Sequence, residues 1–109
     1  MSSWDLIARR EQYYNLLENT KDVLSSITRA RDILLDHKAD AETNFKIDDD
    51  NADDGFYNEK IVELNSLVNS LTNIIIPSIN SKIYNLGQDI ERAQEREEEE
   101  RKAEEAGKD

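Results

Sequence analysis

Carboxylates dominate the residues that could do chemistry. The segment "IDDDNADDGFYNEK", residues 47–60, places five aspartates in eight positions before Gly55. Such a density suggests calcium, and an EF-hand loop needs oxygen ligands at positions 1, 3, 5 and 12 with glycine at position 6. With Gly55 at position 6, Ala52 and Ile61 fall on ligand positions, and a loop starting at Asp49 has a lysine at position 12. Neither alignment supplies the ligands, so we expect a turn between helices, with weak cation binding as the alternative.

Nothing else in the chain resembles a catalytic set. The single histidine, His37, has no partner cysteine, because the chain contains none. No glycine-rich phosphate loop and no Ser-His-Asp set is present, and the carboxylates lie in polar segments that would not shift their pKa values. We therefore expect a protein that is not an enzyme and that uses no cofactor or metal.

The negative charge is concentrated in two segments. The net charge is −11, and residues 48–54 hold five aspartates while residues 91–109 hold nine acidic and five basic side chains. Without a basic patch, such a chain is repelled by nucleic acid and by anionic lipid. No apolar run exceeds three residues, as at residues 74–76, and the first residues lack the apolar run of a secretory signal. We expect a cytoplasmic protein, with any export following a route that needs no signal peptide.

Two long helical segments must position these residues. Ser2 with Asp5 three residues later is typical of a helix start, and no proline or glycine interrupts positions 1–54. Apolar residues recur at spacings of three and four, as on one face of a helix. The predicted elements are a helix over 3–46, a turn over 47–55 with Gly55 and Phe56 at its end, a helix over 56–95 and a fraying charged extension over 96–109. Two long helices joined by a short turn run antiparallel, so the predicted fold is an all-α, coiled-coil-like helical hairpin.

The apolar stripes differ between the two helices. The first comprises Tyr13, Leu16, Leu17, Val23, Leu24, Ile27, Ala30, Leu34, Ala41 and Phe45, interrupted by Thr20, His37 and Lys38. The second comprises Tyr57, Ile61, Leu64, Val68, Leu71, Ile75, Ile79, Ile83, Leu86, Ile90 and Ala93. Two consecutive steps of four, from Leu71 to Ile79, interrupt its heptad pattern. Pro77 lies within this stutter, and it predicts a kink in an otherwise continuous helix.

The middle of the second helix predicts an interface. Residues 64–81 carry no charge, although 36% of the chain is charged. Further apolar residues, such as Val62 and Ile74, make the apolar face wider than a two-stranded coil can bury. A face with serines and asparagines in place of charges loses less free energy when another protein covers it. The predicted interface residues are Leu64, Leu67, Val68, Leu71, Ile74, Ile75, Ile79 and Ile83.

A short, acidic, cysteine-free helical hairpin resembles the accessory proteins of type VII secretion, the WXG-like hairpins and the helical partners of LXG-type toxins. The resemblance covers residues 3–95. The Trp-x-Gly turn of that family is absent here, and Gly55 and Phe56 in "DDGFYNE" stand in its place. The resemblance also implies an export signal of the form Tyr/Phe-x-x-x-Asp/Glu, which Phe45 and Asp49 match beside the turn.

Two functions are consistent with these features. The first is a targeting or chaperone module, whose hairpin packs against the helical domain of a secreted toxin or effector. The second is a self-assembling structural or adaptor protein, whose hairpin forms a four-helix-bundle homodimer. Both require a protein partner for the uncharged middle of the second helix.

Overall fold

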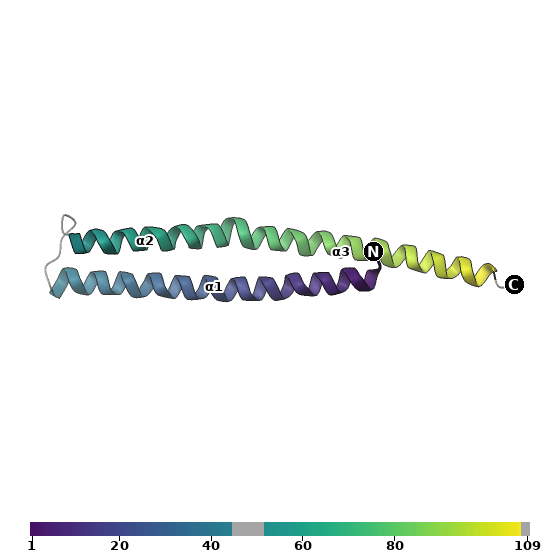
Figure 1. Cartoon of the computed structure of the whole chain (residues 1–109), viewed down its shortest axis with the longest axis horizontal. Helices are drawn as coiled ribbons and strands as arrows, with labels where there is room; N and C mark the ends of the chain where they lie inside the picture. Colours follow the sequence, from purple (N-terminus) through teal and green to yellow (C-terminus); the bar gives the residue numbers. More distant parts are fainter. Residues whose placement is uncertain (45–51, 108–109) are drawn as a thin grey trace. The chain divides into compact units, whose positions relative to one another are not determined.

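The computed structural model describes residues 1–44 and 52–107, and the elements in these ranges are all helical (Figure 1). In chain order they are α1 (Ser3–Asn44), α2 (Ala52–Ser70), the π-helix η1 (Leu71–Ile75) and α3 (Ile76–Gly107). The predicted all-α class and the antiparallel hairpin of two long helical segments are confirmed.

The start of α1 forms as its sequence predicts. The backbone N–H of Asp5 donates to Ser2 Oγ at 3.2 Å, and Ser2 Oγ donates to a carboxylate oxygen of Asp5 at 2.9 Å. The Leu6 N–H donates to the Ser2 carbonyl at 3.1 Å, which is the first bond of the helical ladder. Ser2 thereby satisfies a backbone donor that has no partner within the helix.

The first of two compact units contains Met1–Glu18 and Ser78–Asp109. In it the beginning of α1 packs antiparallel to α3, and its core holds Leu17, Ile79, Leu86, Ile90 and Ala93, each at most 9% exposed. Together with half-buried Ile83, the buried positions on α3 recur at steps of three and four. This is the seam of a two-stranded helical pair.

The second unit, Asn19–Pro77, buries fewer of its described side chains than the first. Among its described residues only Thr20 and Ala41 are buried. Its other seam residues are half-buried: Leu24, Ile27, Leu34, Ile61, Leu64, Val68 and Leu71. Apolar residues of this unit therefore keep much of their contact with solvent.

Part of the expected stripe of α1 was wrong, because Ala30 and His37 are exposed. Thr20 and Lys38, expected as weak points of the stripe, are buried and half-buried in the seam, and so is Arg31, which the stripe did not include. The reason is that the seam follows strict steps of three and four from Leu17, whatever side chain falls on each position. Long basic side chains tolerate this, because their methylene stems pack while their charges reach water.

The second helix begins earlier than predicted. It starts at Ala52, so Gly55 and Phe56 lie inside α2 and do not belong to the turn. Gly55 does not adopt a positive φ, and a Cβ added to it would meet nothing within 4 Å. Aspartates are favourable in the first turn of a helix, where they interact with the positive end of the helix dipole, and this favours an early start.

The irregularity predicted around Pro77 takes the form of a π-helix. In η1 the Ile76 N–H donates to the Leu71 carbonyl, which is an i→i−5 bond. Proline lacks an N–H and its ring collides with the carbonyl four residues earlier, so a widened turn just before it relieves the conflict. Two successive steps of four also exceed the 3.6 residues of an α-helical turn. The wider turn of η1 returns the stripe to the same side.

The charged extension is helical as far as Gly107. Residues 98–107 are exposed throughout, and Arg101 pairs with Glu98 and with Glu105, its neighbours at three and four residues. Such pairs support a helix that buries nothing. The extension predicted over 96–109 thus continues α3 as a mostly exposed helix as far as Gly107.

Candidate binding surface

The described residues offer little for catalysis or for metal binding. Within residues 1–44 and 52–107 no group of three or more His, Cys, Asp or Glu side chains could hold a metal. His37 is exposed on α1. Phe45 and Asp49, the candidate export signal, lie outside the described residues. The features with functional geometry in the described ranges are surfaces.

The structure divides the predicted interface into covered and exposed members. Leu64, Val68 and Leu71 are half-buried in the seam of the second unit, and in the first unit Ile79 is buried and Ile83 half-buried. These five serve the packing of the hairpin itself. The exposed members are Leu67, Ile74 and Ile75, at 49%, 63% and 41%.

The polar contact between Arg31 and Asn65 gives the register of the second unit. An Arg31 guanidinium N–H donates to the Asn65 side-chain oxygen at 3.1 Å. In an antiparallel pair, eight residues back from Arg31 correspond to eight residues forward from Asn65. Val23 is therefore level with residue 73, at the centre of η1.

An apolar flank follows from this register, and its members are Val23, Leu67 and Ile75. Val23 directly precedes the seam residue Leu24, and Leu67 directly precedes the seam residue Val68. In an antiparallel pair of helices, residues at these two positions lie on the same side of the seam. Because each residue of a π-helix turns through a smaller angle than in an α-helix, η1 brings Ile75 to the side of Leu67. Val23 is 50% exposed, close to the values for the other two. Both helices of the unit thus contribute to one exposed apolar flank.

The remaining exposure has an appreciable free energy. Fully burying a side chain of this size is worth about 1.5–3 kcal/mol. The three members of the apolar flank are roughly half exposed, so covering the rest would contribute about 1 kcal/mol each. A partner that covers the whole apolar flank therefore gains an affinity contribution of about 3 kcal/mol before other terms.

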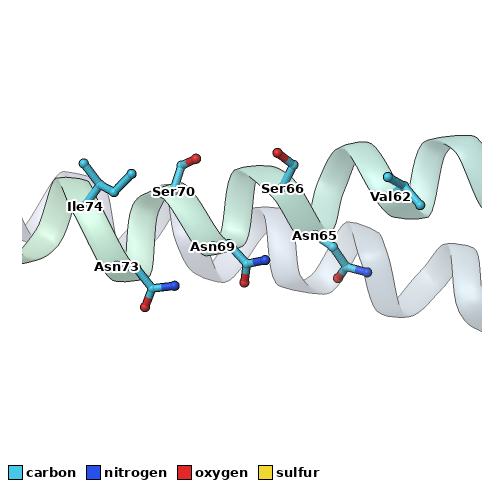
Figure 2. A pocket seen from close by; sticks show the side chains of 7 residues that line it. All are labelled: Val62, Asn65, Ser66, Asn69, Ser70, Asn73 and Ile74. Atoms are coloured by element: carbon cyan, nitrogen blue, oxygen red, sulfur yellow. The ribbon is translucent and has the colours of Figure 1, made fainter.

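A second surface lies along one side of α2 and η1, and we call it the outer face. Its member Asn65 borders the seam and accepts the hydrogen bond from Arg31. Its members are Val62, Asn65, Ser66, Asn69, Ser70, Asn73 and Ile74. Figure 2 shows them in two rows along the helix, one with Val62, Ser66, Ser70 and Ile74 and the other with the three asparagines. They line an open depression of about 450 Å³ that carries no charge.

The ends of the first unit are joined by hydrogen bonds to Glu97. The backbone N–H and the Oγ of Ser3 donate to the two carboxylate oxygens of Glu97, at 2.8 and 2.6 Å. Arg96 donates to the Met1 carbonyl at 3.3 Å. The two bonds from Ser3 lower the pKa of Glu97, and the charge of Arg96 acts in the same direction. The contact positions the start of α1 on α3 and has no feature of a catalytic site.

An aromatic depression of about 500 Å³ also lies in the first unit, where Tyr14 and Tyr84 flank Gly87 beside Arg10. Both tyrosines are exposed, at 43% and 65%. A Cβ on Gly87 would come within 3.9 Å of the Arg10 guanidinium, an ordinary contact. The depression is shallow, and nothing in it points to a particular ligand.

Comparison of the chain with protein-family models, with curated proteins and with solved structures gave no match. Of the helices in the described part of the chain, none has a stretch that is long and apolar enough to span a membrane.

Sequence reasoning missed the role of Val23 and the contact between Arg31 and Asn65. Val23 was grouped with Leu24 as a stripe residue, although a strict seam can use only one of two neighbours. The seven-residue spacing from Leu17 to Leu24 to Arg31 was the available signal. It places Val23 beside the seam and Arg31 in it.

Proposed function

We propose that the chain is a non-enzymatic helical binding module, and that the helical domain of another protein covers its apolar flank. The observation that carries the proposal is the contrast within the second unit. Its described residues bury only Thr20 and Ala41, yet Val23, Leu67 and Ile75 remain 41–50% exposed on one flank. A hairpin with this flank gains stability and loses exposed apolar surface when a further helix packs on it.

The chemistry of the apolar flank supports a helical partner. It suits a helix with an apolar stripe at spacings of three and four, and the uncharged residues 64–81 offer no ion pairs to it. The net charge of −11 lies largely outside this region and would keep the complex apart from nucleic acid and anionic lipid.

The biological role that we propose is targeting. The resemblance to type VII secretion accessory hairpins suggests that the partner is the helical N-terminal domain of an LXG-type toxin or effector. In this role the module covers the apolar surface of that domain and accompanies it to the secretion machinery. Phe45 and Asp49 would then present the export signal near the end of the first helix.

The test is co-purification with the helical N-terminal domain of a toxin encoded beside this gene. Leu67→Ser and Val23→Ser remove apolar surface from the flank, whereas the matched control Ile33→Ser removes it from an exposed residue elsewhere on α1. Each flank variant should weaken binding roughly fivefold to tenfold, because about 1 kcal/mol is lost and 1.4 kcal/mol is tenfold. The control should bind like the wild type. Equal binding by all four proteins would refute the proposal.

A further inference from the structure

The outer face has an unusual internal symmetry. Its first row is Val62, Ser66, Ser70 and Ile74, and its second row is three asparagines at the same spacing, centred on Asn69 (Figure 2). Each row has nearly the same order of side-chain types in both directions. The ends of the first row are branched and apolar, with exposed fractions of 66% and 63%.

We propose that the outer face is the interface to a second copy of this chain. The two α2–η1 segments would lie antiparallel about a twofold axis level with residues 68–69, within about 1 Å of the centres of both rows. Val62 of one copy then opposes Ile74 of the other, and Ser66 opposes Ser70. A twofold interface uses the same patch on both copies, so the patch must be complementary to itself, and this pairing sets apolar ends against apolar ends and serines against serines.

The chemistry of the outer face favours a second copy over a different partner. Each asparagine amide carries both donors and acceptors, so the Asn69 side chains of the two copies can satisfy each other when they leave water, while the Asn65 oxygen already accepts from Arg31. The serines are small and permit a close approach of the two helices. Nearby Glu63 is paired with Lys60 at 3.4 Å, and residues 64–81 carry no charge. Two chains of charge −11 can therefore meet here with little local repulsion, whereas a charged peptide would find no counter-charge.

The proposed dimer is weak. From Val62 to Ile74 the face is about 18 Å long at 1.5 Å per residue. A single helix face of this length buries less than the area of about 800 Å² per partner that a standard interface covers. The dimer should therefore dissociate on dilution at concentrations on the order of micromolar or above. The outer face shares no residue with the apolar flank, so the dimer and the proposed function can fail independently.

The absence of cysteine makes a direct test possible. Three single-cysteine variants are oxidised at protein concentrations of about tens of micromolar: Asn69→Cys, Val62→Cys and Ile74→Cys. The control is Ser26→Cys, at an exposed position on α1, and circular dichroism confirms that each variant is helical. Asn69→Cys should form a disulfide-linked dimer at least tenfold faster than the control. Val62→Cys and Ile74→Cys should each link slowly alone, but readily when mixed.

Two results would overturn the proposal. One is a rate for Asn69→Cys no higher than that of Ser26→Cys, since Asn69 lies beside the proposed axis. The other is fast linkage of Val62→Cys with itself, which would indicate parallel pairing. If the outer face is protected only when the helical domain of a toxin is co-expressed, its occupant is that protein and the dimer is wrong. The variant Leu67→Ser, which tests the flank, should leave the cross-linking of Asn69→Cys unchanged.

Discussion

Replacing Ile90 by alanine tests the packing of the first unit. Ile90 is only 4% exposed, the lowest value among the buried apolar residues of the described chain. Its truncation loses the burial of three carbon atoms and leaves a cavity, for which Ile→Ala changes cost about 2–5 kcal/mol. In a pair of helices the neighbours can close much of the cavity, so we expect about 2 kcal/mol, at the lower end of that range.

The assay is thermal unfolding followed by circular dichroism at 222 nm. For a domain of this size, 2 kcal/mol corresponds to a decrease in Tm of about 8–16 °C. The matched control is Ile33→Ala, since Ile33 is 51% exposed and alanine is the better helix former. The control should change Tm by no more than about 2 °C. Equal decreases for both variants would refute the assigned burial.

Three further predictions concern single residues. Leu71→Asp places a charge in the half-buried seam of the second unit and should lower the free energy of unfolding by several kcal/mol. The expected result is a loss of helicity, measured by circular dichroism at 222 nm, and a fully helical, equally stable variant would contradict this. Glu97→Gln removes a carboxylate whose pKa is lowered by hydrogen bonds from Ser3. A carboxylate whose pKa is lowered in the folded protein stabilises the fold at pH values above its ordinary pKa of 4.5, and this stabilisation is lost as the pH falls through the folded-state pKa. Wild type and Glu97→Gln should therefore differ in Tm near neutral pH and converge in acid. Asp49→Ala and Asp50→Ala, which lie outside the described residues, should change stability by less than about 0.5 kcal/mol; a saturable rise in helicity with micromolar calcium in the wild type would contradict the turn interpretation.

The sequence predicted the fold well, because helical periodicity is a strong signal. The predicted stripe of the second helix includes the buried residues Ile79, Leu86, Ile90 and Ala93, and the stutter that contains Pro77 overlaps η1. The errors on α1 came from weighing side-chain polarity over spacing. Arg31 and Lys38 fall on seam positions, and their long stems tolerate the site.

The candidate surfaces were less predictable. Apolar content showed that Leu67 and Ile74 exceed what a thin hairpin can bury, and both are exposed. The side that Ile74 and Ile75 face depends on the π-helix, and the placement of an i→i−5 bond is a backbone detail that composition does not encode. The contact of Ser3 with Glu97 joins residues far apart in the chain, so no local pattern could reveal it.

Hydrogen exchange of the backbone amides tests the central claim most directly. The isolated chain is compared with the chain bound to the helical domain of a co-expressed toxin. Amides of residues 61–76 should exchange much faster than those of residues 79–93 in the isolated chain, and they should become protected in the complex. Equal, strong protection of the two segments in the isolated chain, with no change on mixing, would contradict the claim that another protein covers the apolar flank.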